Sequence, residues 1–125
     1  MMTVSVRYIV DDARVAAAFY RDHLGFRVRM EAGAGFAMLD RDDLRLLLNA
    51  PGAGGAGQGD GRRPPEPGGW NRIQLEVDDV AAARARLAEA GVELRSPVLH
   101  GNAGSQVLVA DPSGNLVELF ERATT

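Results

Sequence analysis

The sequence predicts an α+β protein built from two copies of one small unit, each with a strand, a helix and three further strands. Val10–Asp12 and Val77–Asp79 each lead into a helical pattern, and these patterns end at Gly25 and Gly91, about 66–67 residues apart. A chain of 125 residues allows one compact domain or two very small units. A glycine- and proline-rich stretch separates the two copies. Repetition of one unit is therefore the simplest prediction.

The first unit covers residues 1–50, and alternation of side chains predicts its strands. The apolar face of the first strand, 4–10, is expected to carry Val4, Val6, Tyr8 and Val10. Its other face is expected to carry Ser5, Arg7 and Ile9. Further strands are expected at 26–32, 36–40 and 44–49. In the last of these, one face carries Leu44, Leu46 and Leu48, and the other carries Arg45, Leu47 and Asn49.

Two helices are predicted, over 13–23 and 80–90. Asp12 and Asp79 stand where a short carboxylate can accept the free N–H groups of a first helical turn. Gly25 and Gly91 stand where a helix ends in a left-handed residue. The buried stripe of the first helix is expected to contain Val15, Phe19 and Leu24.

Residues 51–69 are predicted to be a Gly/Pro-rich linker. Its many glycines make regular structure unfavourable, because glycine loses the most backbone entropy on ordering. We expect a mobile connection between the units, with a second interpretation as a flap over a site.

The second unit covers residues 70–125. Its first strand alternates, with Ile73, Leu75 and Val77 on one face. Strands are also expected near 93–97, 105–110 and 116–121. Asp111–Asn115 predicts a tight hairpin turn, because proline presets φ and glycine permits a positive φ.

The composition excludes several kinds of chemistry. Without cysteine there are no disulfides, cysteine-ligated metals or thiol nucleophiles, and because every one of the 14 basic residues is arginine, no Schiff-base lysine. A net charge of −3 does not indicate the basic surface that nucleic-acid binding requires. No apolar run approaches the ~18–20 residues of a membrane span. We expect a cytoplasmic protein with neither nucleic acid nor membrane as a partner.

Two motifs resemble those of a known superfamily. They are Val10-x-Asp12 followed by Phe19-Tyr20-x-x-x-Leu24-Gly25-Phe26, and Asp111-Pro112-x-Gly114-Asn115-x-x-Glu118-Leu119. Both resemble the vicinal oxygen chelate superfamily, which includes glyoxalase I, extradiol dioxygenases and bleomycin-resistance proteins. The resemblance implies two βαβββ modules, a cupped and mostly antiparallel sheet, and a homodimer.

The resemblance also implies where a metal would be held. Members that use a metal place ligands on the first and last strands of each module, which map here to Ser5, Arg45, Arg72 and Glu118. Only Glu118 is a ligand type, because a guanidinium offers no lone pair and stays charged. We therefore expect no metal, no other cofactor and no catalytic residue, as in the superfamily's metal-free binding proteins.

The faces opposite the apolar ones supply the candidate site. The residues expected to contact a ligand are Ser5, Arg7, Phe36, Met38, Arg45, Leu47, Asn49, Trp70, Arg72, Gln74, His100, Gln106, Leu108, Glu118 and Phe120. Each also has a structural interpretation: an ion pair such as Arg72 with Glu118, a solvated loop position for His100, an anchor for the linker at Trp70, or plain core for the apolar residues.

The leading hypothesis is a non-enzymatic dimer that binds a small hydrophobic or aromatic ligand, such as an antibiotic, and confers resistance by sequestration. The alternative is a glyoxalase- or dioxygenase-like enzyme of the same superfamily. It would use a displaced metal site with Glu118, Glu76 or His100, or one of Glu118 and His100 as a metal-free base. A third hypothesis is a ligand-responsive accessory protein.

Overall fold

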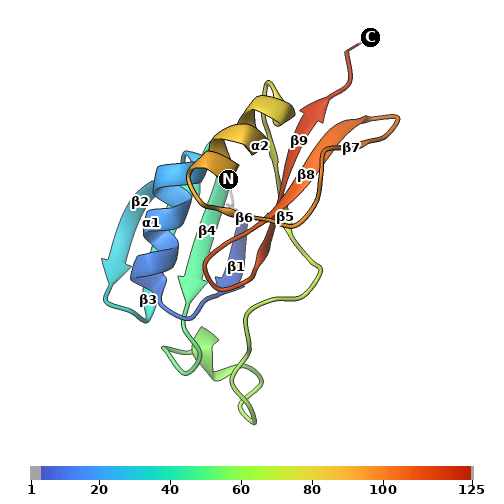
Figure 1. Cartoon of the computed structure of the whole chain (residues 1–125). Helices are drawn as coiled ribbons and strands as arrows, with labels where there is room; N and C mark the ends of the chain where they lie inside the picture. Colours follow the sequence, from blue (N-terminus) through green and yellow to red (C-terminus); the bar gives the residue numbers. More distant parts are fainter. Residues whose placement is uncertain (1–3, 125) are drawn as a thin grey trace. The chain divides into compact units, whose positions relative to one another are not determined.

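The computed structural model describes residues 4–124, which form two compact units that divide after Gly68. Unit 1 ends at Gly68 and unit 2 begins at Gly69. Each unit has one α-helix and one sheet (Figure 1). The prediction of an α+β fold with two similar units is therefore confirmed. Among residues 4–124, no helix is both long enough and apolar enough to span a membrane.

Unit 1 places its first and last strands side by side. Its elements are β1 (Ser5–Ile9), α1 (Ala13–Leu24), β2 (Arg27–Ala32), β3 (Phe36–Arg41) and β4 (Leu44–Asn49). The strand order is β1-β4-β3-β2, with β1 parallel to β4 and the other neighbours antiparallel (Figure 1). This pairing needs α1 as the crossover between β1 and the remaining strands.

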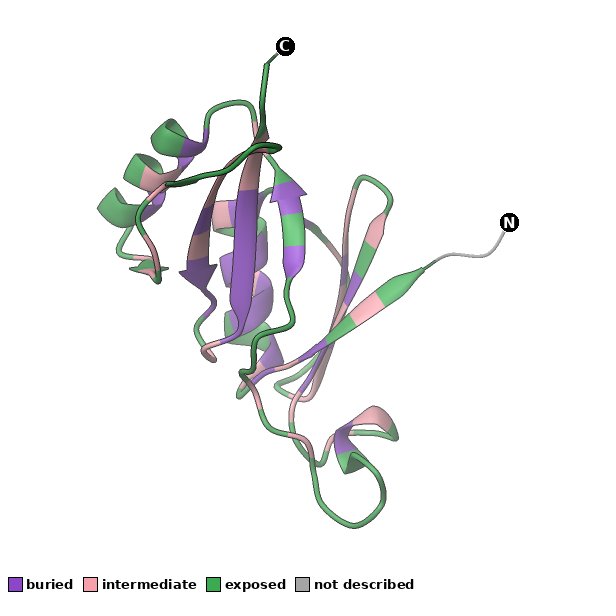
Figure 2. Cartoon of the chain, turned by 90° about the vertical axis from the view of Figure 1, so that its right-hand side faces the viewer, coloured by how far each residue is buried: buried purple, intermediate pink, exposed green. Residues whose placement is uncertain are grey.

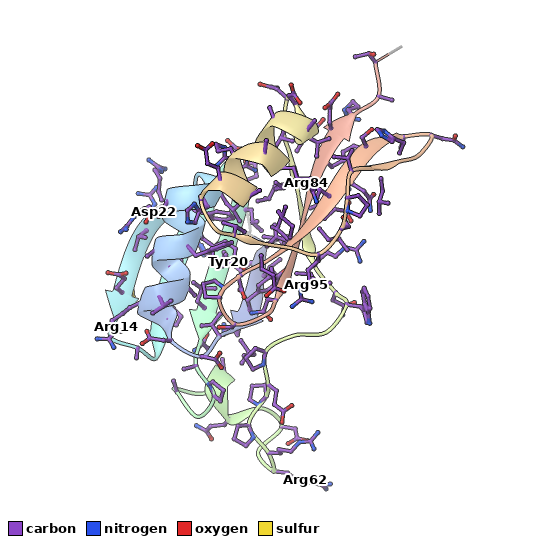
Figure 3. The ribbon with its side chains drawn as sticks, viewed as in Figure 1. Arg14, Tyr20, Asp22, Arg62, Arg84 and Arg95 are labelled. Carbon is purple, nitrogen blue, oxygen red and sulfur yellow. The ribbon has the colours of Figure 1, made fainter. Side chains whose placement is uncertain are left out.

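Helix α1 begins and ends as the sequence predicts. The Asp12 carboxylate accepts hydrogen bonds from the backbone N–H groups of Arg14 and Val15, and Gly25 ends the helix with a φ of 75°. The buried stripe differs from the prediction in one residue, since Val15 is 53% exposed. Tyr20 is fully buried instead, and its ring makes edge-on contacts with Tyr8, Phe19 and Phe26 (Figure 3).

The sheet of unit 1 has one buried face and one open face. The buried face packs against α1 and carries Tyr8, Ala37, Leu39, Leu46 and Leu48. The strand register places a second set of residues opposite one another, facing away from the helix. We call this set the open face of unit 1; it contains Ser5, Arg7, Phe36, Met38, Asp40, Arg45, Leu47 and Asn49.

Unit 2 repeats the arrangement, but its second strand is broken into two short pieces. Its elements are β5 (Ile73–Glu76), α2 (Val80–Glu89), β6 (Glu93–Leu94), β7 (Leu99–His100), β8 (Gly104–Ala110) and β9 (Leu116–Arg122). The order is β5-β9-β8-β6, with β7 also paired to β8 and β5 parallel to β9. The side facing α2 buries Ile73, Leu75, Val107, Val109, Val117 and Leu119 (Figure 2).

The predicted strand over 93–97 is wrong beyond Leu94. The Ser96 hydroxyl accepts the hydrogen bond of the Leu108 backbone N–H at 2.9 Å, so a side chain replaces a strand partner. Pro97 follows without an N–H to donate. Pairing resumes at β7, which places His100 in a short strand and not in the predicted loop.

The predicted hairpin at Asp111–Asn115 is confirmed. One carboxylate oxygen of Asp111 accepts hydrogen bonds from the backbone N–H groups of Ser113 and Asn115, both at 2.9 Å. The other accepts from the Asn115 amide at 3.0 Å. This turn fixes the register of β8 against β9, which places Glu118 of β9 opposite Leu108 of β8.

Residues 51–69 contain a regular turn that the sequence does not predict. A 3-10 helix covers Ala56–Gln58, and Gly57 is buried inside it (Figure 2). The backbone N–H of Gly57 donates to the carbonyl of Ala53, and the Ala50 N–H donates to the carbonyl of Gly35 in front of β3. The segment is mostly exposed but is tied to the sheet of unit 1.

Candidate functional site

The open faces of the two sheets hold nearly all of the predicted ligand contacts. In unit 1 the register places Arg7 opposite Leu47, and Asn49 opposite Phe36. The side of the unit 2 sheet that faces away from α2 is its open face. It carries Gln74, Glu76, Gln106, Leu108, Glu118 and Phe120. Each set belongs to its own unit and is described separately.

A pocket of about 430 Å³ lies on the open face of unit 1. Three predicted residues line it, namely Arg7, Phe36 and Asn49. The Arg7 guanidinium donates a hydrogen bond to the Asn49 side-chain oxygen at 3.3 Å. The structure thus gathers a cation, an amide and an aromatic ring around one hollow, a combination typical of small-molecule sites.

The sequence does not predict the remaining residues that line the pocket. They are Ala32, Gly35, Ala53, Gly54, Gly55 and Ala56. The segment after β4 was expected to be a mobile linker, whereas part of it forms a wall of the pocket. One signal could have suggested this: Asn49, the last polar residue of the strand, is followed at once by small residues that permit close packing.

Asp40, at the end of β3, is neutralised by arginines from β2. Its carboxylate accepts hydrogen bonds from Arg29 and Arg27, and a register shift between Val28 and Met30 brings both cations to it. The Arg29 hydrogen bond, with a smaller contribution from Arg27, holds the pKa of Asp40 below its ordinary value. The negative charge of Asp40 is therefore already balanced by arginines of the same sheet.

In unit 2 a buried carboxylate is engaged on both oxygens by two neighbouring side chains. Glu118 is 7% exposed. Its Oε1 accepts from Arg72 Nε at 3.0 Å and Arg72 Nη2 at 2.8 Å, and its Oε2 accepts from Gln74 Nε2 at 2.6 Å. The ion pair considered in the sequence analysis is therefore formed. Charge-assisted bonds to both oxygens stabilise an otherwise unfavourable buried anion.

The residues at the mapped metal positions do not fit a cation. Ser5 and Arg45 are paired across β1 and β4, and neither supplies a strong oxygen or nitrogen ligand. Arg72 and Glu118 are joined to each other. Within residues 4–124, no three acidic or histidine side chains gather closely enough to hold a metal ion.

Two other predicted contacts have distinct environments. Trp70 is 78% exposed, and its backbone carbonyl accepts a hydrogen bond from Arg72 Nη1 at 3.4 Å. His100 Nδ1 lies 2.8 Å from the Ser105 hydroxyl across β7 and β8. Trp70 thus contacts Arg72, the ion-pair partner of Glu118, through its backbone and keeps its side chain exposed. His100, by contrast, is engaged in a hydrogen bond between two strands.

The apolar candidates are neither fully buried nor fully exposed. All five are half-buried: Phe36, Met38, Leu47, Leu108 and Phe120. By contrast, Leu46, Leu48, Val107 and Val109, which face the helices, are fully buried. The open faces therefore keep accessible apolar area, which favours a binding surface over plain core.

The chain belongs to the Glyoxalase/Bleomycin resistance protein/Dioxygenase superfamily, whose sequence profile matches residues 3–119. The superfamily resemblance is thereby confirmed. The family's name joins glyoxalases and dioxygenases, which are enzymes, with bleomycin resistance proteins. None of the curated proteins matches this sequence.

Solved structures of both functional classes resemble this chain. TnmS3, an antibiotic binding protein from Streptomyces sp. CB03234, is 26% identical with a TM-score of 0.73, over 98% of this chain and 97% of that one. The bleomycin-binding protein of Streptomyces verticillus is 22% identical, with a TM-score of 0.66 and 98% of both chains covered. Lactoylglutathione lyase from Agrobacterium tumefaciens is also 22% identical, with a TM-score of 0.75 over 97% of this chain and 92% of that one. The last two likenesses show the fold alone.

Proposed function

We propose that this protein is a non-enzymatic binding protein for a small aromatic natural product, such as an antibiotic. Each unit offers the open face of its own sheet as a binding surface. The observation that carries the proposal is that both oxygens of Glu118 are engaged: Arg72 donates two hydrogen bonds to one oxygen and Gln74 donates one to the other. A carboxylate engaged in this way is poorly placed to bind a metal or to accept a substrate proton.

The surroundings of Glu118 support recognition in place of reaction. The exposed indole of Trp70 offers a flat stacking surface, and half-buried Leu108 and Phe120 offer apolar area on the same open face as Glu118. The polar groups are fixed by their own hydrogen bonds, so they lose little entropy when a ligand arrives. The similarity to TnmS3 adds a precedent for antibiotic binding within the superfamily.

Binding of this kind protects a cell by mass action. A protein in excess over the drug lowers the free concentration when its dissociation constant lies below the toxic level. We propose that the protein acts in this way in the cytoplasm and as a homodimer. Analytical ultracentrifugation would test the dimer, and a protein that stays monomeric at micromolar concentration would remove that part of the proposal.

The experiment that tests the proposed function is a titration against a panel of polycyclic natural products. Trp70, the only tryptophan, provides the signal through quenching of its fluorescence, and calorimetry gives the stoichiometry. We expect at least one compound to bind stoichiometrically and to be recovered unchanged. Chemical conversion of a bound compound at a rate above that of free solution would contradict the proposal, as would the absence of binding across the panel.

The matched variant for this experiment is Trp70→Ala, whose affinity is measured by calorimetry because the substitution removes the only tryptophan. Stacking on an aromatic side chain contributes about 1–3 kcal/mol, so the affinity should fall roughly five- to hundredfold. Val15→Ala removes an exposed apolar side chain from helix α1, which packs on the side of the unit 1 sheet opposite its open face, and should leave the affinity unchanged.

A further inference from the structure

One wall of the pocket of unit 1 is a tight turn in the segment that follows β4. The turn is closed by hydrogen bonds from the Gly52 N–H to the Gly57 carbonyl at 2.6 Å and from the Gly57 N–H to the Ala53 carbonyl at 2.9 Å. A Cβ atom at Gly57 would lie 2.7 Å from the Ala50 carbonyl oxygen, so only glycine fits there without a shift. The Ala50 N–H in turn donates to the Gly35 carbonyl, which anchors this wall at the sheet.

Arg7 brings a positive charge to this pocket that no carboxylate balances. Its side-chain hydrogen bond goes to the neutral amide of Asn49. No acidic residue lines the pocket, and none of the ion pairs formed among residues 4–124 includes Arg7. Arg72 of unit 2, by contrast, is paired with Glu118. Arg7 thus retains N–H donors that a ligand anion can satisfy.

We propose that the pocket of unit 1 binds the carboxylate of an aromatic acid, with Arg7 as the anion-binding residue and Phe36 as the contact for the ring. A guanidinium can donate two parallel hydrogen bonds to one carboxylate, and its affinity for a planar anion exceeds that for a neutral amide. The methyl groups of Ala32, Ala53 and Ala56 complete an apolar surround. This inference rests on the proposed function and specifies its ligand as an acid.

The size of the pocket limits the part of the ligand that enters it. A volume of about 430 Å³ lies toward the small end of ordinary ligand sites. It suits one or two fused rings with a carboxylate. The remainder of a larger natural product would lie outside it.

The test compares 2-naphthoate with 2-naphthamide, which differ in charge and hardly in shape. Binding to the full chain is measured by amide chemical-shift changes, which also locate the ligand. We expect 2-naphthoate to shift the amides of Phe36, Asn49 and residues 53–56. The neutral amide should bind about ten- to hundredfold more weakly, the range of a charge-assisted hydrogen bond. Equal binding of the two compounds, or shifts confined to unit 2, would overturn the proposal.

Two substitutions separate a local role of Arg7 from general attraction of anions. Arg7→Gln removes the charge but keeps a donor for Asn49, and should weaken 2-naphthoate binding about ten- to hundredfold. Arg62→Gln removes an identical charge from the exposed segment of the same unit and should leave binding unchanged (Figure 3). Equal losses in both variants would refute the assignment. If Arg7→Gln unfolds, Ala32→Phe, which fills the pocket without altering charge, must abolish binding of 2-naphthoate.

Failure of this inference is distinguishable from failure of the proposed function. Neutral polycyclic compounds that quench Trp70, together with no preference for 2-naphthoate, would remove the acid assignment alone. Absence of all binding, including that of the acids, would remove both.

Discussion

Replacing Arg72 with methionine tests whether its ion pair holds the centre of the unit 2 open face together. The substitution removes both hydrogen bonds to Glu118 Oε1 and leaves only the Gln74 amide on Oε2. The side chain of Glu118 is 9% exposed and that of Arg72 is 28% exposed. Removing one partner of a fully buried pair costs about 3–5 kcal/mol. Because water reaches Arg72, we expect Arg72→Met to lower the free energy of unfolding by about 2–3 kcal/mol.

The assay is equilibrium unfolding in urea, followed by circular dichroism. The double variant Arg72→Met/Glu118→Gln removes the unpaired charge and keeps an oxygen for Gln74, so its stability should return to within about 1 kcal/mol of the wild type. Arg122→Met breaks an exposed pair with Glu76 in the same sheet and should have little effect. A loss for Arg72→Met no greater than that for Arg122→Met would refute the reasoning, as would a double variant no more stable than the single one.

Two further predictions concern the wall of the pocket and the start of α1. Gly57→Ala should lower the free energy of unfolding by about 1–3 kcal/mol, because its Cβ would meet the Ala50 carbonyl. The control is Gly55→Ala, whose Cβ would meet nothing within 4 Å. Equal urea midpoints for the two variants would contradict the close packing at Gly57. The hydrogen bond from Arg14 holds the pKa of Asp12 below its ordinary value of 3.8, so the stability this carboxylate contributes is complete above that value and declines as pH falls through the lowered pKa. Asp12→Ala should therefore be less stable than the wild type around neutral pH, with a difference that shrinks in acid; thermal unfolding across pH measures this, and a difference independent of pH would contradict it.

Much of the fold could be predicted because the relevant interactions are local. Alternation along 44–49 predicts which leucines are buried, since side chains alternate between the faces of a strand. Asp12 and Asp79 both cap their helices as expected. Val15 was placed wrongly because periodicity gives a helix stripe only approximately, and the large ring of Tyr20 fills the core that Val15 was expected to reach.

The pocket could not be predicted, for a physical reason. Its wall depends on several glycines adopting positive φ together, at Gly52 and Gly54 among others, and on close approaches that only missing Cβ atoms allow. A glycine-rich sequence is compatible with both a flexible chain and a tight turn. The break after Leu94 is of the same kind, because it depends on the Ser96 hydroxyl meeting a distant backbone group, the N–H of Leu108.

We propose that this chain binds its ligand through its own side chains, with the Arg72–Glu118 pair at two of the positions where metal-using relatives are expected to place ligands. The most direct measurement is a calorimetric titration with a natural product from the panel, in the presence and absence of a chelator, together with metal analysis of the purified protein. We expect the same dissociation constant and stoichiometry with and without the chelator. An ion held stoichiometrically by Glu118, whose removal abolishes binding, would contradict it.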